Sequence, residues 1–418
     1  MSVPKLRSTA AVLTTMSALA ATSILGGPSA AEPFSTEPCA LHRTEVHHSE
    51  GVDTWNPAYT RPTGTLDAVL VFLSFPDATP RTTPAALTAD HFPETSRFYE
   101  RSSYGRFTLR PHPLDRWLRM PRPSTAYAIR RDWNAEDRAA YLRDAFAVAD
   151  RAVDFSRYRI VYFVADPDAP GVDSDATKVV NLQTPLRVDG TDIRRVVTVF
   201  EHHPPDRLVL AHETGHLFDL PDLYHRPGDG KGDWDTHVGD WDLMGSQFGL
   251  APDLFAWHKW KAGWLDPRQV VCVRGTTPTR LTLEPLEAGP GGWARDGSGA
   301  PAFGLGHGVK LAVVRTGPES ALAFEARGRG GDDRTSCRQG ILVYRVRGDI
   351  ASGDGPVQVV DAHPRTEACW ESSVYPPLAD APVFLGESFT VPEDGVKVEA
   401  EGVTASGAWT VKITPAVK

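Results

Sequence analysis

The chain has 418 residues, 41% of them hydrophobic and 23% charged, the composition of a globular protein with room for two or three domains. Its formal net charge is −9, and no long run of lysine or arginine appears. This balance argues against nucleic acid as a partner and indicates a soluble protein.

The first 31 residues have the pattern of a secretory signal. Lys5 and Arg7 precede an apolar, alanine-rich run over residues 9–25, and small residues follow up to Ala31. The run is short for a bilayer span and is diluted by Ser and Thr, so a membrane anchor is the weaker alternative. We expect cleavage after Ala31, secretion of the protein, and no membrane span elsewhere in the chain.

Residues 32–64 are rich in Pro, Thr, Glu and His without a regular period, and we interpret them as an irregular arm. Its adjacent histidines, His47 and His48, could bind a metal ion. Histidines on such an arm are more often solvated, so we expect no site there.

Strands alternate with helices over residues 65–267, which predicts an α/β domain whose metal-binding helix packs on a sheet. Apolar runs predict strands over residues 66–77, from about 107, over 158–166 and over 194–200. Helical periodicity or helix-stop signals predict helices over residues 90–105, 135–155 and 252–261.

The most informative spacing is His212-Glu213-x-x-His216. Residues four apart share one face of a helix, so both imidazoles can bind a single Zn²⁺ ion. Glu213 lies beside the first ligand, where it can act as the general base for a zinc-bound water. We expect Asp206 to be the N-cap of this helix. The alternative is a surface helix with two solvated histidines.

A third zinc ligand is expected at Asp222, six residues beyond His216, after the chain leaves the helix and turns at a Leu-Pro pair. A carboxylate oxygen is an ordinary zinc ligand, and three protein ligands leave the fourth position for water. Met244, which glycine follows, is interpreted as a methionine turn that forms an apolar floor below the ligands. The alternative for Met244 is a simple core filler.

The loop between the third ligand and the methionine turn is rich in glycine and aspartate, which favours Ca²⁺ as a second ion. It is not an EF-hand loop, because Lys231 and Trp234 stand where an acceptor and a glycine are required. The expected calcium ligands are Asp229, Asp233, Asp235 and Asp240. The alternative is a solvated polar loop, and residues 165–177 are a weaker calcium candidate.

After residue 267 the pattern changes to short, mostly alternating apolar runs separated by Gly, Pro and Asp. This pattern is typical of an antiparallel β-sandwich or a similar β-domain, which we expect over residues 268–418. No metal-ligand spacing occurs in it. A role in binding carbohydrate or a cell surface is open.

The four cysteines are an even number, which indicates disulfides in an exported protein. Of the three possible connectivities we favour Cys337–Cys369 with Cys39–Cys272, because the first pair is close in sequence. The alternative for Cys39 is a bond to the metal ion that keeps the site latent.

Five segments occur in an order that is more specific than any one of them: "VLVFLSFPD", "FYERSSYGRF", "HETGHLFDLPDLY", "GDWDLMG" and "WHKWKAGWL". Together they resemble the immune inhibitor A-like family of secreted zinc metallopeptidases, within the metzincin group. The resemblance spans most of the chain from Leu66 onward. It implies a metzincin-like peptidase domain with a β-domain behind it, a zinc endopeptidase that uses His212, His216, Asp222 and Glu213, and frequent calcium sites.

Two positions depart from the family pattern. The family has glycine where this chain has Asp219, at the point where the chain leaves the helix with positive φ. Aspartate tolerates that geometry at a modest cost, so Asp219→Gly is expected to relieve strain, but Asp219 is also an alternative third ligand. No tyrosine closely follows Met244, so none is assigned to oxyanion stabilisation.

These residues predict a monomeric zinc metalloendopeptidase that acts on protein or peptide substrates. Two alternatives stay open. One is a catalytically silent adhesin or binding protein that retains the fold, although a pure binding protein has no need of Glu213. The other is a zinc hydrolase with the same residues and a non-protein substrate.

Overall fold

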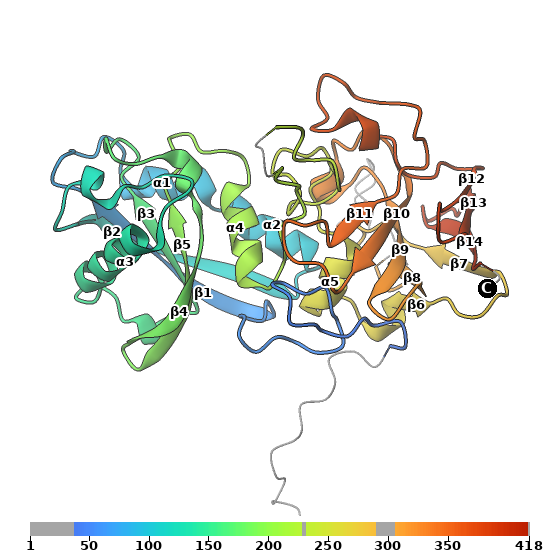
Figure 1. Ribbon diagram of the computed structural model, residues 1–418, viewed down its shortest axis with the longest axis horizontal. Coiled ribbons are helices and arrows are strands. Elements are labelled where there is room, and N and C mark those ends of the chain that lie inside the picture. The colour runs from blue at the N-terminus through green and yellow to red at the C-terminus, as the bar shows by residue number, and fades with distance from the viewer. Residues whose placement is uncertain (1–36, 228–230, 290–305, 417–418) are drawn as a thin grey trace, which may run out of the picture. The chain divides into compact units, whose positions relative to one another are not determined.

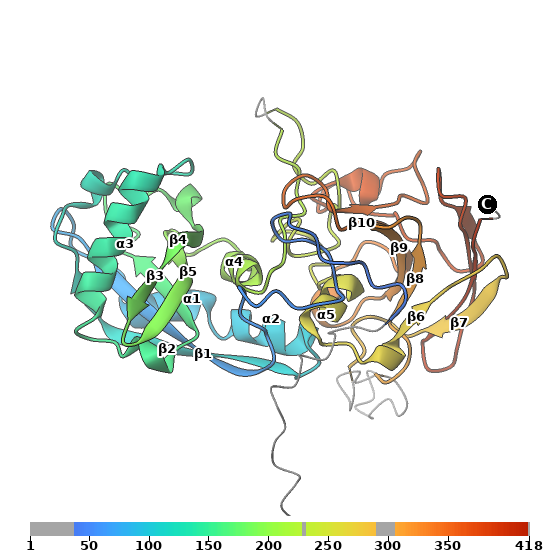
Figure 2. The same cartoon turned by 60° about the horizontal axis from the view of Figure 1, so that its bottom comes forward.

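The computed structural model describes residues 37–227, 231–289 and 306–416, all within one compact unit over residues 35–418. The expected signal segment, residues 1–31, lies outside the described residues. The described part of the chain combines several β-sheets with a few short helices in a mixed α/β architecture (Figures 1 and 2). None of its helices is long and apolar enough to cross a membrane.

The first sheet has the strand order β2-β1-β3-β5-β4. Its strands are β1 (Gly64–Ser74), β2 (Phe107–Arg119), β3 (Ile160–Ala165), β4 (Lys178–Val188) and β5 (Thr191–Val199). All neighbours are parallel except β4, which pairs antiparallel with β5 at the sheet edge. The central strands β1 and β3 are continuous apolar runs because both faces of the sheet are covered.

Helices cover the two faces of this sheet (Figure 1). They are α1 (Pro84–His91), α2 (Glu94–Ser102), α3 (Ala135–Ala149) and α4 (Val209–Leu217). Val69 and Val71 share a core with α3, whereas Leu70 and Phe72 of the same strand share the other core with α1, α2 and α4. Alternate β1 side chains therefore anchor opposite helical layers, and α4 lies on the face that also carries α2.

Two further sheets follow the last helix, α5 (Ala256–Ala262). Their strand orders are β11-β10-β9-β8-β6 and β12-β13-β14-β7. The strands are β6 (Val270–Cys272), β7 (Thr279–Leu283), β8 (Leu311–Arg315), β9 (Ser320–Arg327), β10 (Gly340–Arg347), β11 (Val357–Val359), β12 (Ser388–Thr390), β13 (Lys397–Val403) and β14 (Trp409–Thr414). Pairing is antiparallel except between β6 and β8. One hydrophobic core, which includes Phe324 and Val411, takes side chains from both sheets.

Most of the predicted elements are present, with shifted ends. The last helix of the α/β region begins at Ala256 instead of residue 252, because Phe255 has a non-helical ψ of 147° and Asp253 bonds to Ser102 and Lys259. Helix α3 ends at Ala149 instead of residue 155. The sequence did not predict the short strands β6, β11 and β12, or the edge strand β4.

The two favoured disulfides, Cys39–Cys272 and Cys337–Cys369, are both formed. Cys39 is therefore not available as a metal ligand. Residues 37–63 of the arm contain no helix or strand, as expected, and its last residue, Gly64, begins β1. The expectation that its histidines are solvated is wrong for His48, which is only 5% exposed because it packs against the segment that follows α4.

Candidate metal centre

Helix α4 places His212 and His216 on one face and fixes the orientation of both imidazoles. His212 Nδ1 lies 2.9 Å from the Leu243 carbonyl oxygen, and His216 Nδ1 lies 2.8 Å from the Leu220 carbonyl oxygen. A carbonyl oxygen can only accept, so each Nδ1 must carry the proton. In the neutral rings, each Nε2 then presents a free lone pair, as a metal ligand requires.

Asp222 brings a third lone pair to the same point. Its Oδ1 lies 3.4 Å from His212 Nε2 and 3.1 Å from His216 Nε2. This oxygen is buried and makes no geometrically acceptable hydrogen bond. Among the described residues, this trio forms the one group of three His, Cys, Asp or Glu side chains compact enough to hold a metal ion.

Three electron-pair donors around one point repel each other unless a cation lies among them. A proton on one imidazole can fill the same role as a metal cation, and the pKa shifts within the trio describe that charge pair. Burial alone would lower the pKa of His216, but the nearby Asp222 carboxylate raises it to about 9. Burial alone would raise the pKa of Asp222, but the imidazoles of His216 and His212 hold it well below its usual range. The donor set of two imidazoles and one carboxylate fits Zn²⁺.

Asp219 has the positive φ expected at the exit from the helix, 62°. Its carboxylate does not join the trio. Oδ2 accepts from Arg43 Nη1 at 2.8 Å, and Oδ1 lies 3.0 Å from His48 Nδ1. Burial alone would raise its pKa, but Lys261, His48 and Arg43 hold the pKa of Asp219 below its ordinary value. The expected gain from Asp219→Gly is therefore opposed, because that change would remove the carboxylate that faces the buried Lys261 ammonium and pairs with the Arg43 guanidinium.

Glu213 lines the same cleft, whose volume is about 600 Å³. Its Oε2 accepts a hydrogen bond of 2.8 Å from the backbone N–H of Val179, in the edge strand β4. Burial raises the pKa of Glu213, although His216 and His212 oppose that rise. A carboxylate with a raised pKa, fixed beside three ligand atoms, is suited to accept and return a proton.

Helix α4 begins differently from the prediction. Leu208, in a left-handed conformation with φ 58°, precedes its first residue, and no side chain caps it. Asp206 is not the N-cap, because it lies two positions before Leu208 and its carbonyl oxygen, not its side chain, accepts from Val209 N. The helix is stabilised by packing instead of by a cap.

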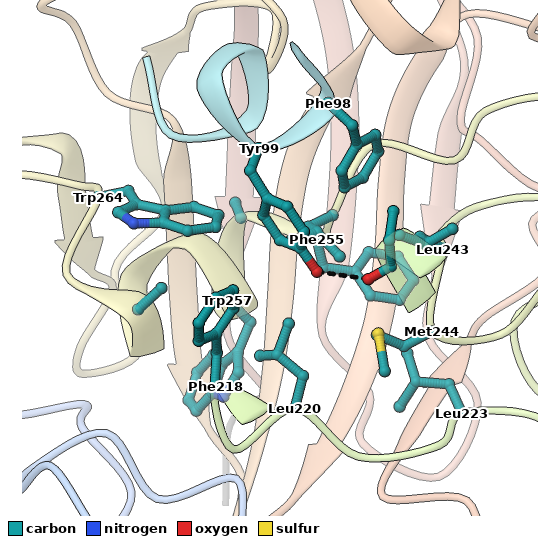
Figure 3. Close-up of a cluster of buried hydrophobic side chains, with 14 of the residues drawn as sticks. Phe98, Tyr99, Phe218, Leu220, Leu223, Leu243, Met244, Phe255, Trp257 and Trp264 are labelled. Atoms are coloured by element: carbon teal, nitrogen blue, oxygen red, sulfur yellow. Dashed lines mark hydrogen bonds between the residues drawn. The ribbon is translucent and has the colours of Figure 1, made fainter. Parts of the chain in front are cut away.

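Met244 forms part of the floor below α4, in a cluster that includes Tyr99, Phe218 and Leu223 (Figure 3). A methyl group at Gly215 would lie 2.5 Å from Met244 Sδ, so glycine between the two histidines lets the helix rest on the methionine. Tyr99 supports the same turn by donating a 2.5 Å hydrogen bond to the Ala211 carbonyl oxygen.

The acidic loop gives no compact calcium centre among the described residues. Asp240 is buried, and its oxygens accept from Leu250 N, Val374 N and Ser373 Oγ. Asp235 lines the cleft, and burial raises its pKa to about 6. Asp233 is exposed, and Asp229 lies outside the described residues. Calcium binding by these aspartates stays a prediction.

Several residues at the cleft were missed by sequence reasoning. Tyr224 stacks on His212 with ring centroids 6.2 Å apart, and Trp234 stacks on Tyr224 at 5.5 Å. The guanidinium groups of Arg131 and Arg226 lie over the Trp234 ring. Tyr224 is only two residues beyond Asp222, which is the one local signal that it belongs to the site.

Comparison with known proteins leaves this site to be interpreted from its own geometry. No protein-family model and no curated protein matches the chain. A crystal structure of wild-type OgpA from Akkermansia muciniphila matches with 11% identity and a TM-score of 0.29, covering 85% of this chain and 94% of that chain. A second crystal form of OgpA gives 10% identity and a TM-score of 0.26, covering 73% and 95%. Similarity this weak supports no conclusion, and the resemblance to immune inhibitor A-like peptidases stays a prediction.

Proposed function

We propose that the protein is a secreted, zinc-dependent endopeptidase of metzincin-like type. The observation that carries this proposal is the buried Oδ1 of Asp222, which faces two imidazole nitrogens and has no hydrogen bond of its own. His212, His216 and Asp222 would hold the ion. When bound, zinc lowers the pKa of a coordinated water and polarises the scissile carbonyl.

The chain supplies the proton transfers. Glu213 is fixed by Val179 N–H and lies in the cleft with the three ligands. It accepts the proton of the attacking water and passes it to the leaving amine, a role worth roughly 10²–10⁴-fold in rate. Residues Lys178, Val179 and Asn181 of β4 line the cleft together with Glu213, which supports an extended peptide lying along this strand within reach of the base. The two disulfides support export, because such bonds persist in oxidising compartments.

The test is metal analysis of the purified protein together with casein digestion, with and without a chelator. We expect one zinc per chain, and digestion that chelator abolishes and added zinc restores. Glu213→Ala is expected to keep the zinc and lose digestion. Near-normal digestion by Glu213→Ala would refute the mechanism. Zinc retention without digestion in the unmodified protein would favour a non-protein substrate instead.

A further inference from the structure

The loop between β10 and β11, residues 348–356, reaches the segment that carries the third ligand. Ser352 Oγ accepts a 2.8 Å hydrogen bond from the Asp222 backbone N–H and donates a 3.2 Å bond to Asp222 Oδ2. The next backbone N–H, that of Gly353, donates to the Asp222 carbonyl oxygen at 2.9 Å. Two adjacent loop residues thus contact Asp222 at three of its polar groups.

These bonds fix the orientation of the Asp222 carboxylate relative to the histidines. The χ2 torsion of an aspartate is broad, so the backbone alone does not fix the plane of the carboxylate. The backbone N–H of Asp222 can only donate, which leaves the single hydroxyl proton of Ser352 free to bond Oδ2. With Oδ2 engaged, Oδ1 is the atom that points at the two Nε2 nitrogens.

The loop is itself held in place by the arm. Ser352 N donates to the His47 carbonyl oxygen at 3.2 Å. Thr44 Oγ1 and Ser49 Oγ both donate to the Gly348 carbonyl oxygen, at 2.6 Å and 3.0 Å. Because the Cys39–Cys272 disulfide joins the arm to β6, the serine is part of a fixed frame and not of a freely moving hairpin.

We infer that Ser352 is a positioning residue for the third metal ligand, so that the C-terminal strands form part of the metal centre. This inference rests on the proposed function. Partners that orient a ligand from behind typically contribute about 10–100-fold to metal affinity. The role requires a hydroxyl that can accept and donate at once, which threonine retains and alanine lacks.

The experiment uses the full chain with Ser352→Ala, Ser352→Thr and Ser406→Ala, and the probe is zinc alone. Ser406 is the matched control, because its hydroxyl bonds only locally, to Thr404, in the exposed β13–β14 turn. Zinc dissociation constants are measured by competition with a chromophoric chelator, and thermal unfolding is followed in excess chelator. We expect Ser352→Ala to bind zinc about 10–100-fold more weakly. We expect Ser352→Thr and Ser406→Ala to match the unmodified protein.

Unfolding in chelator separates positioning from a structural role. We expect the metal-free Ser352→Ala protein to unfold near the temperature of the metal-free unmodified protein. A large loss of metal-free stability, or failure of Ser352→Thr to restore affinity, would overturn the inference. Unchanged zinc affinity in Ser352→Ala would also overturn it and leave the proposed function intact. Failure of the proposed function would show separately, as an unmodified protein that binds no zinc.

Discussion

The molecule contains two clusters of histidine and carboxylate that use the same groups in opposite ways. At the candidate metal centre, the Nδ1 of each histidine bonds a backbone carbonyl, and each Nε2 faces Asp222 Oδ1. In the second cluster, His258 Nδ1 lies 3.0 Å from Asp242 Oδ2, and its Nε2 lies 2.9 Å from Glu50 Oε1. The first cluster borders a cleft, whereas all three side chains of the second are fully buried.

The partner of each ring nitrogen decides what the histidine can do. A carbonyl on Nδ1 leaves the neutral ring with a lone pair for a metal ion. Carboxylates on both nitrogens favour the doubly protonated ring, and they raise the pKa of His258 to about 9 although burial alone would lower it. The first cluster therefore keeps two ring nitrogens and a carboxylate oxygen together at the cleft, where a metal ion can replace a proton, whereas the second encloses its histidine between two carboxylates.

Residues 242–244 connect the two clusters. Asp242 accepts from His258, the Leu243 carbonyl oxygen accepts from His212, and Met244 packs below α4. The arm reaches both as well, because Glu50 bonds His258 while the His48 ring stacks on His216 with centroids 5.7 Å apart. We therefore expect the buried cluster to support the metal centre. Substituting a residue of this cluster tests whether it affects the stability of the fold or the affinity for the metal ion.

The largest expected effect is from Asp222→Ala, which removes the only carboxylate of the trio. We expect zinc affinity to fall by more than about 100-fold, beyond the range for groups that merely orient a ligand. Asp219→Asn is the control, because it keeps the shape of the rival carboxylate. Zinc content of both variants, measured after gel filtration, decides the assignment. Loss of zinc from Asp219→Asn with retention in Asp222→Ala would make Asp219 the ligand.

The next effect concerns Glu50, whose loss would break the buried cluster without touching a ligand. Glu50→Gln leaves His258 with Asp242 as its one carboxylate partner and removes the carboxylate that pairs with the buried Lys261, and we expect a loss of about 3–5 kcal/mol in the free energy of unfolding. Glu45→Gln, on the exposed part of the same arm, should cost under about 0.5 kcal/mol. Denaturant unfolding in excess zinc measures both. Equal stability of the two variants would show that the cluster contributes little.

The distance along the chain between interacting groups explains which of these features the sequence predicted. His212, Glu213, His216 and Asp222 lie within eleven residues, so helical spacing and a turn were enough to propose them together. Ser352 contacts Asp222 across 130 positions, and Glu50 contacts His258 across 208. No local period encodes such pairs, and their polar side chains are indistinguishable from solvated ones in sequence.

For the fold as well, the sequence predicted the elements that have a clear local pattern and missed those that do not. Strands β1 and β3 are covered on both faces, so continuous apolar runs revealed them. Strand β4 lies at the sheet edge with polar residues such as Lys178 and Asn181, and it was missed although its second residue fixes Glu213. The arm has no hydrophobic period, so its packing against Asp219 and α5 could not be predicted from composition.

A smaller effect is expected from pH, through His258. Below about pH 6.5 the ring is protonated in both the folded and the unfolded chain, so its stabilising contribution is fully present. As pH rises towards 9 the unfolded chain loses this proton while the folded chain holds it, and stability falls by about 2–3 kcal/mol.

The variant His258→Gln isolates that contribution. We expect the stability gap between the unmodified protein and His258→Gln to narrow between pH 6.5 and 9, measured by denaturant unfolding in excess zinc. His42→Gln is the control, since the His42 side chain is 75% exposed and its pair with Asp53 is screened by water. A gap that stays constant or widens with pH would mean that His258 is not held protonated.

The smallest effect is expected from Met244→Leu, at the point where the two clusters meet. The methionine turn of the sequence prediction requires a special role for this side chain, whereas its packing requires only an apolar group of similar volume against Gly215. We expect Met244→Leu to cost less than about 1.5 kcal/mol and to leave zinc affinity unchanged. Met120→Leu is the matched control, because Met120 is equally buried but lies in the core on the α3 side of the sheet. If Met244→Leu binds zinc more weakly and Met120→Leu does not, the sulfur atom below the helix affects zinc binding in addition to filling the space under the ligands.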